Sequence, residues 1–251
     1  MRNQDQTVAA LCARAFAVVV FACVLINGNW SEASGQQRTQ QRQPRLAPVK
    51  PVPDEVILRI MRAEDERRWD NDLGVLLFDK DARVRERAAL AAGRIGDERA
   101  VASLVALLQT DAEASVRAMA AFALGETESA AGAASLSDVA QKAKETNEVR
   151  ARAIEALGKI IAALPKTDEA RGQLLGAIIL KTLEEEQRRS PKPSREVILL
   201  GLTAALRARP ANAGSVISRF LSSTDARVRA DAANTLARLR AKDGLEQLRV
   251  L

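Results

Sequence analysis

The chain has 251 residues, a formal net charge of +6, 3% aromatic residues, two cysteines and no histidine or tyrosine. Without histidine most catalytic triads and zinc sites are excluded, so we expect no catalytic activity, no metal and no cofactor. Few aromatic residues and abundant alanine favour closely packed helices over a β-sandwich.

Residues 1–33 have the pattern of a secretory signal peptide. Arg2 and Arg14 precede an apolar run over residues 15–26, and the small residues Ser31 and Ala33 suit cleavage before Ser34. The run is shorter than the roughly 20 residues that a transmembrane helix needs. We therefore expect export to the bacterial periplasm or outside the cell, with no stable membrane span after cleavage. An uncleaved N-terminal anchor is the alternative. Cleavage would also remove both cysteines.

Residues 34–53 are rich in Gln, Arg and Pro and carry four basic residues without an acidic one. Such a composition cannot bury a core, so it predicts a disordered linker. Residues 1–33 are neutral overall and residues 34–53 carry +4, so residues 54–251 have a net charge of only +2. That part lacks the strong basic bias of most nucleic-acid binders, and we expect no nucleic-acid partner.

From residue 54 onward one phrase recurs, consisting of a capping residue, two further residues, Val-Arg and an Ala-rich run. Its valines are Val84, Val116, Val149, Val197 and Val228. They are separated by 32, 33, 48 and 31 residues. Self-similarity at such a period predicts a solenoid of stacked helix pairs. We call the helix that carries the phrase the B helix and the preceding helix the A helix.

The predicted array begins with a helix capped by Asp54 and a second helix over residues 70–78. Further A helices are predicted over residues 98–109, 130–144, 168–188 and 211–222. Residues 244–251 look like the start of another A helix without its B partner. The array over residues 54–251 is therefore expected to be truncated at its C-terminus or to continue beyond it.

Three residues before the valines stand Asp81, Glu113, Thr146, Ser194 and Asp225. All except Glu113 are good helix N-caps. When the valine is counted as position 0, positions +4, +7 and +8 share its helix face. They hold mainly Ala, Gly and Leu, which predicts B helices that approach their neighbours closely.

The fourth unit departs from the pattern. It has about fifteen extra residues, and Ile198 stands where the other copies have arginine. The run from Glu184 to Arg189 at the end of its A helix is interpreted as a solvated helix end.

The pattern Asp-x-x-Val-Arg-x-x-Ala-Ala-x-Ala-Leu-Gly, followed by a short A helix such as residues 100–108, resembles HEAT repeats of the short type named after phycobilisome (PBS) lyases. The resemblance covers roughly residues 70–251. It implies an all-α fold, a right-handed α-solenoid of about five to six antiparallel helix pairs. It also implies a ladder of Asp and Arg side chains between neighbouring units, which Ile198 would interrupt. Its members would be Asp81, Arg85, Arg117, Arg150, Asp225 and Arg229.

Solenoids present extended concave surfaces, so we expect a non-catalytic scaffold, a monomer, that binds a protein partner through its B helices. Positions +3 and +6 vary between units, as expected of an outward face. The candidate binding residues are Arg87, Leu90, Met119, Phe122, Arg152 and Glu155. Phe122 can anchor a partner or pack into the core between repeats, and the sequence leaves both possibilities open.

Two alternatives concern the whole protein. The chain also resembles the HEAT portion of secreted bacterial proteins in which such repeats precede a cyclophilin-type prolyl isomerase domain. No cyclophilin motif occurs in these residues. The second alternative is a chromophore-handling protein related to PBS lyases.

Overall fold

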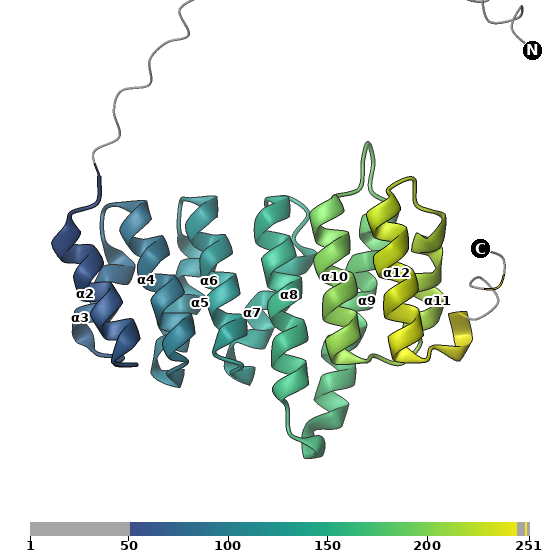
Figure 1. The fold of residues 1–251 in the computed structure, drawn as a ribbon, viewed down its shortest axis with the longest axis horizontal. Helices are drawn as coiled ribbons and strands as arrows, with labels where there is room; N and C mark the ends of the chain where they lie inside the picture. The colour runs from purple at the N-terminus through teal and green to yellow at the C-terminus, as the bar shows by residue number, and fades with distance from the viewer. Residues whose placement is uncertain (1–50, 245–248, 250–251) are drawn as a thin grey trace, which may run out of the picture. The chain divides into compact units, whose positions relative to one another are not determined.

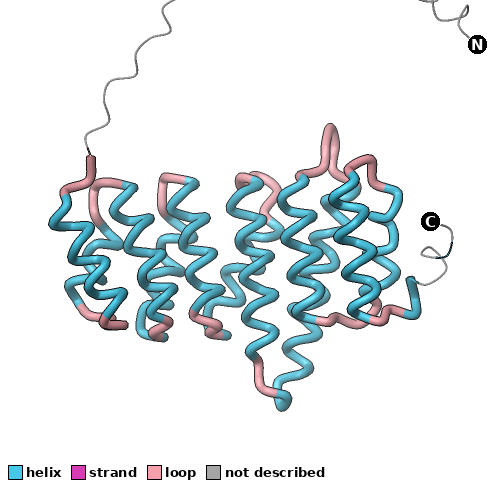
Figure 2. The backbone as a smooth tube through the Cα atoms, viewed as in Figure 1, coloured by secondary structure: helices cyan, strands magenta, loops and turns pink. Residues whose placement is uncertain are grey.

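Two rows of antiparallel helices build the part of the chain that the computed structural model describes, residues 51–244 and Arg249 (Figure 1). The first row contains α2 (Asp54–Asp65), α4 (Ala82–Ile95), α6 (Ala114–Glu126), α8 (Asn147–Ala163), α10 (Arg195–Ala208) and α12 (Ala226–Leu239). The second row contains α3 (Asn71–Gly74), α5 (Val101–Thr110), α7 (Ala133–Gln141), α9 (Glu169–Gln187) and α11 (Ala213–Ile217). After α2 the described helices form five A–B pairs, without a strand (Figure 2). The predicted all-α solenoid is confirmed. The predicted signal peptide, almost all of the predicted linker and the C-terminal helix fall outside the described residues.

The A elements cover nearly the predicted residues, but each combines an α-helix with a 3-10 helix. Short 3-10 helices extend them: η1 (Val75–Phe78), η2 (Glu98–Ala100), η3 (Ala130–Gly132), η4 (Lys166–Asp168), η5 (Ser218–Ser222) and η6 (Lys242–Gly244). Two of these begin at a residue whose side chain caps the turn, since Asp97 accepts from the Arg99 N–H and Ser129 from the Ala131 N–H. Tight 3-10 turns of this kind are common at helix ends.

The predicted N-caps of the B helices are confirmed, with one correction at the start of the array. The side chains of Asp81, Thr146, Ser194 and Asp225 accept hydrogen bonds from first-turn N–H groups, whereas Glu113 makes no such bond. Asp54 is not an N-cap. It is the first helical residue of α2, and the Pro53 carbonyl accepts from the next turn instead. The Asp54 carboxylate still suits the positive end of the helix dipole.

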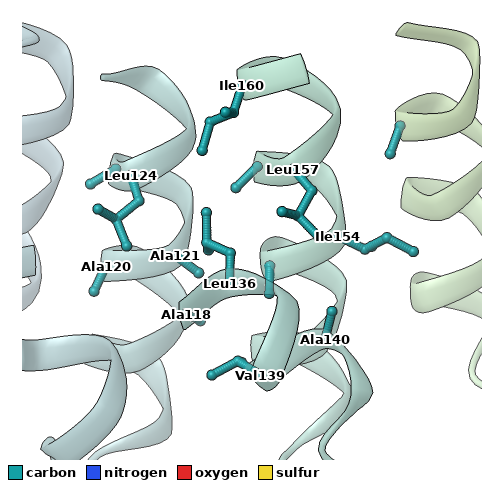
Figure 3. Packing of buried hydrophobic residues seen from close by; sticks show 14 of the residues in the cluster. Ala118, Ala120, Ala121, Leu124, Leu136, Val139, Ala140, Ile154, Leu157 and Ile160 are labelled. Carbon is teal, nitrogen blue, oxygen red and sulfur yellow. The ribbon is translucent and has the colours of Figure 1, made fainter. Parts of the chain in front are cut away.

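The B helices pack through small residues, as the repeated phrase predicts. Positions +4, +7 and +8 are buried in every copy, and Figure 3 shows Ala120, Leu124 and Leu157 among the packed side chains. Position +9 brings the backbones closest. A Cβ built on Gly158 would lie 2.6 Å from Ala204 Cα, and Gly93 and Gly125 make the equivalent contact with the next B helix. In α10 and α12 this position holds Leu206 and Ala237 instead.

The repeated arginine links each unit to the next. Arg85 Nε and Nη2 donate to the carboxylate of Asp111 at 2.7 and 2.9 Å, while its Nη1 donates to loop carbonyls of its own unit. Arg117 repeats the arrangement with Glu145 at 3.1 and 2.7 Å. Each guanidinium therefore closes one loop and joins two units, and bidentate pairs of this kind are the stronger ion pairs.

Each such arginine–carboxylate pair is one rung of the ladder, and the third rung, formed by Arg150, corrects our interpretation of residues 184–189 as a solvated helix end. Arg150 Nη1 donates to Glu186 at 2.8 Å, and the two side chains are 4% and 0% exposed. Glu186 also accepts from the Ser194 N–H at 2.5 Å. The segment after α9 folds back over the helix end and buries this carboxylate. Glu186 is therefore not solvated, whereas Glu184 and Glu185 pair with cations at the surface.

Two acids that the resemblance placed in the ladder have other roles. Asp81 pairs with Arg83 of its own helix, and Asp225 accepts from Arg195 of the preceding unit at 2.6 Å. The break at Ile198 is present. The residue that faces it in register, five before the next valine, is Ser223, so neither half of this rung is charged.

Because the ladder contains carboxylates, we expect the stability of the fold to depend on pH. The hydrogen bond from Arg85 lowers the pKa of Asp111 below its ordinary value of 3.8. Burial raises the pKa of Glu145, but the bonds from Arg117 and the Thr146 N–H outweigh it and keep that pKa below 4.5. A carboxyl with a lowered folded-state pKa stabilises the fold above its ordinary pKa, and this stabilisation is lost as the pH falls through the folded value.

We therefore expect the free energy of unfolding, measured by urea denaturation, to fall as the pH is lowered from about 5 to about 2. The double variant Arg85→Gln, Asp111→Asn should show a smaller fall than the wild type. An equal fall in both proteins would contradict a contribution from this rung.

Candidate interaction face

Four of the six predicted binding residues meet in one groove between α4, α6 and α8. The groove has a volume of about 220 Å³. Its lining comprises Glu86, Leu90, Ser115, Ala118, Met119, Phe122, Glu148 and Arg152. Leu90 and Met119 are half-buried, and three consecutive B helices contribute to the surface. The repeat therefore brings together side chains more than 60 residues apart in sequence.

Phe122 lies at the edge of the core and is half-buried. Two cations of α8 approach its ring, Lys159 Nζ at 4.3 Å and Arg152 Cζ at 5.7 Å from the centroid. Such cation–π contacts hold an aromatic ring in a fixed orientation. The ring is therefore oriented by cations of the next unit and is not enclosed within the buried core.

Glu155 does not face the groove. Its side chain is buried and accepts from Arg152 at 2.9 Å and from Lys159 at 3.2 Å. Lys159 also pairs with Glu126 of α6 at 2.7 Å. Glu155 thus helps to hold the two cations beside Phe122, and its carboxylate is already used within the chain.

Arg87 also lies outside the groove. Its Nη2 donates to Glu64 of α2 at 2.5 Å, and Arg94 donates to the other oxygen of the same carboxylate. Burial raises the pKa of Glu64, but these two guanidinium groups outweigh it and lower that pKa. The Arg87 side chain is therefore tied to the neighbouring helix α2 and does not line the groove.

A second hollow, which our sequence analysis missed, lies between the C-terminal ends of α10 and α12. Its volume is about 700 Å³, and its lining comprises Thr203, Leu206, Arg207, Arg209, Ala237, Arg238 and Arg240. Four of these seven residues are arginines and none is acidic. The sequence does carry a signal for it, because Arg-x-Arg occurs at positions +10 and +12 of two successive units.

Other kinds of site are not found in the described residues. Among residues 51–244 no three His, Cys, Asp or Glu side chains gather as metal ligands. Within the same part of the chain, no helix has both the length and the apolar character to cross a bilayer.

Stacked helix pairs, tied by a repeated arginine, define an α-solenoid. A family model described as HEAT repeats matches residues 57–125 and 103–190, which together span more than half of the chain. The chain therefore belongs to the HEAT repeat family. A comparison with curated proteins gave no match. Among solved structures, human deoxyhypusine hydroxylase in complex with glycerol is similar, at 19% identity and a TM-score of 0.38. That match covers 77% of this chain and 80% of the other.

Proposed function

We propose that this protein is a non-catalytic, monomeric scaffold whose α4–α6–α8 face binds a protein partner. The observation that carries the proposal is the groove in which Leu90, Met119 and Phe122 gather beside Arg152. Half-buried apolar side chains beside an arginine are typical of interface hot spots. Three or four units also offer enough surface for a standard interface of about 1,600 Å² in total.

We further propose that the scaffold belongs to the bacterial, short PBS-lyase type and works in the cell envelope. The repeat spacing of 31 to 33 residues in the regular units supports the first point. The signal-like pattern of residues 1–33 supports the second, and sequencing the N-terminus of the mature protein would test it. A chain that begins near Ser34 is expected, and an intact Met1 on a cytosolic protein would contradict export.

The binding face is tested with the double variant Phe122→Ala, Arg152→Glu. We expect it to lose at least about tenfold of the affinity for a partner captured by the wild type, because both a buried ring contact and a charge are removed. A matched control is Leu174→Ala, Lys144→Glu, which alters an exposed leucine and an exposed lysine elsewhere. Quantitative pull-down from an envelope extract, followed by titration of the captured protein, measures the effect.

Equal retention by both double variants, or capture of nothing by the wild type, would contradict the proposal. Circular dichroism is recorded on each variant. Loss of helical signal in Phe122→Ala, Arg152→Glu alone would assign Phe122 a structural role and likewise reject the face.

A further inference from the structure

We propose that the hollow between the C-terminal ends of α10 and α12 is a second binding site, and that Arg207, Arg209, Arg238 and Arg240 bind an acidic polypeptide segment there. This site is separate from the groove on α4, α6 and α8. It does not depend on the function proposed for that groove, and the two can be tested independently.

The first argument is that three of these four cations have no partner within residues 51–244. Position +10 also carries a charge in the first three units, but each is paired there: Arg94 with Glu64, and Glu126 with Lys159. Within residues 51–244 the side chains of Arg207, Arg238 and Arg240 form no hydrogen bond or ion pair. Arg209 makes one bond, to the Leu239 carbonyl at 3.4 Å. The guanidinium groups that line the hollow are therefore available to an outside anion.

The second argument comes from the backbone at position +12. Arg209 and Arg240 adopt the left-handed conformation, with φ of 48° and 54°. Gly96 and Glu128 occupy the same position in the first two units, also with positive φ. The last two units place arginine in a conformation that favours glycine. The shared turn geometry places the two arginines at equivalent positions beside the hollow.

The third argument explains why the hollow opens at this joint. Between earlier B helices, glycine at position +9 lets the backbones touch, as Gly158 does with Ala204. In α10 this position is Leu206, which lines the hollow opposite Ala237. α10 and α12 also pack less closely than α8 and α10. The leucine thus separates the helix ends and leaves an apolar floor between the arginines.

The number and kind of the charges favour a ligand with several carboxylates. Guanidinium groups pair with carboxylates in bidentate geometry. Neighbouring helix axes lie about 8–10 Å apart, so four guanidinium groups on two helices offer more than one anion-binding position across the hollow. An extended peptide advances about 3.3 Å per residue, so acidic side chains three apart match this separation. The apolar floor of Leu206 and Ala237 suits the CH₂ groups of glutamate.

A nucleic acid fits less well. A nucleic-acid site normally draws on basic residues spread along the phosphate backbone. Residues 54–251 carry a net charge of only +2. The positive charge is concentrated at this hollow, which suits a short acidic segment.

The test uses the full chain and a fluorescently labelled octaglutamate peptide, with octaglutamine as the neutral control, in fluorescence anisotropy at low salt. Arg207→Glu, Arg238→Glu is expected to weaken octaglutamate binding at least about tenfold. The control Lys144→Glu, Lys166→Glu makes the same change in net charge at exposed lysines elsewhere, and we expect less than about a twofold effect. Arg207→Lys, Arg238→Lys should give a partial loss, because lysine cannot pair in bidentate geometry.

Absence of octaglutamate binding would overturn the proposal, as would an equal loss in both charge-reversed variants, which indicates only general charge attraction. Binding of inorganic polyphosphate through these arginines, without binding of octaglutamate, would assign the site to phosphate polymers and overturn the proposed ligand. Phe122→Ala, Arg152→Glu should keep octaglutamate affinity. The two sites can therefore fail or succeed separately.

Discussion

Replacing Glu186 with alanine is expected to lower the free energy of unfolding by about 3–5 kcal/mol. Glu186 is fully buried and is the carboxylate partner of Arg150, whose side chain is only 4% exposed. Its other oxygen accepts from the Ser194 N–H, which closes the segment after α9. The variant would leave a buried guanidinium without its counter-charge and a buried N–H without its acceptor.

The control is Glu185→Ala, one residue away. Glu185 is exposed and lies 3.8 Å from Lys181, so its removal should cost less than about 0.5 kcal/mol. Arg150→Met, Glu186→Leu removes both charges and should recover much of the loss, since replacing a whole buried pair costs less than breaking it. Urea denaturation measures all three. Equal stability of Glu186→Ala and Glu185→Ala would contradict the buried rung.

The second large effect is expected at Gly158. In an isolated helix, Gly→Ala stabilises by about 1 kcal/mol. Here the new Cβ would lie 2.6 Å from Ala204 Cα and 2.8 Å from its Cβ. Helices α8 and α10 would have to separate. We expect a net loss of about 1–3 kcal/mol, typical of overpacking in a close contact.

Gly172→Ala is the matched control, because the nearest atom to its new Cβ would be Ile161 Cγ2 at 3.6 Å, an ordinary contact. This variant should keep or raise the melting temperature, while Gly158→Ala lowers it. If both substitutions stabilise the protein, the close approach of α8 and α10 is not a constraint on the fold.

The fold could be predicted because its determinants are local and repeated. The caps Asp81, Thr146, Ser194 and Asp225 and the small residues after each valine recur at fixed spacing, so one reading of the phrase applies to each copy. The acids of the ladder could not be found in this way. Asp111, Glu145 and Glu186 stand five, four and eleven residues before the next valine, and the last is brought into place only by the inserted segment.

The candidate site was predicted in part. The rule that positions +3 and +6 face outward selected Leu90, Met119, Phe122 and Arg152, and these four side chains line the groove. The same rule failed for Glu155, because the cations of α8 turn towards it and cover it. Periodicity indicates the helix face of a residue, but which charged side chains pair on that face depends on neighbours in other units.

The joint between α10 and α12 has a consequence for the mechanics of the array. A linear array is stabilised by couplings between nearest neighbours, so its cooperativity is limited by the weakest coupling. This joint lacks the arginine rung and the glycine contact, and it retains the exposed pair of Arg195 and Asp225, a type that contributes little. A polyanion held by arginines of both helices would act as a clamp across it. Occupancy of the hollow would then determine whether the last helix pair, α11 and α12, unfolds alone or together with the other units.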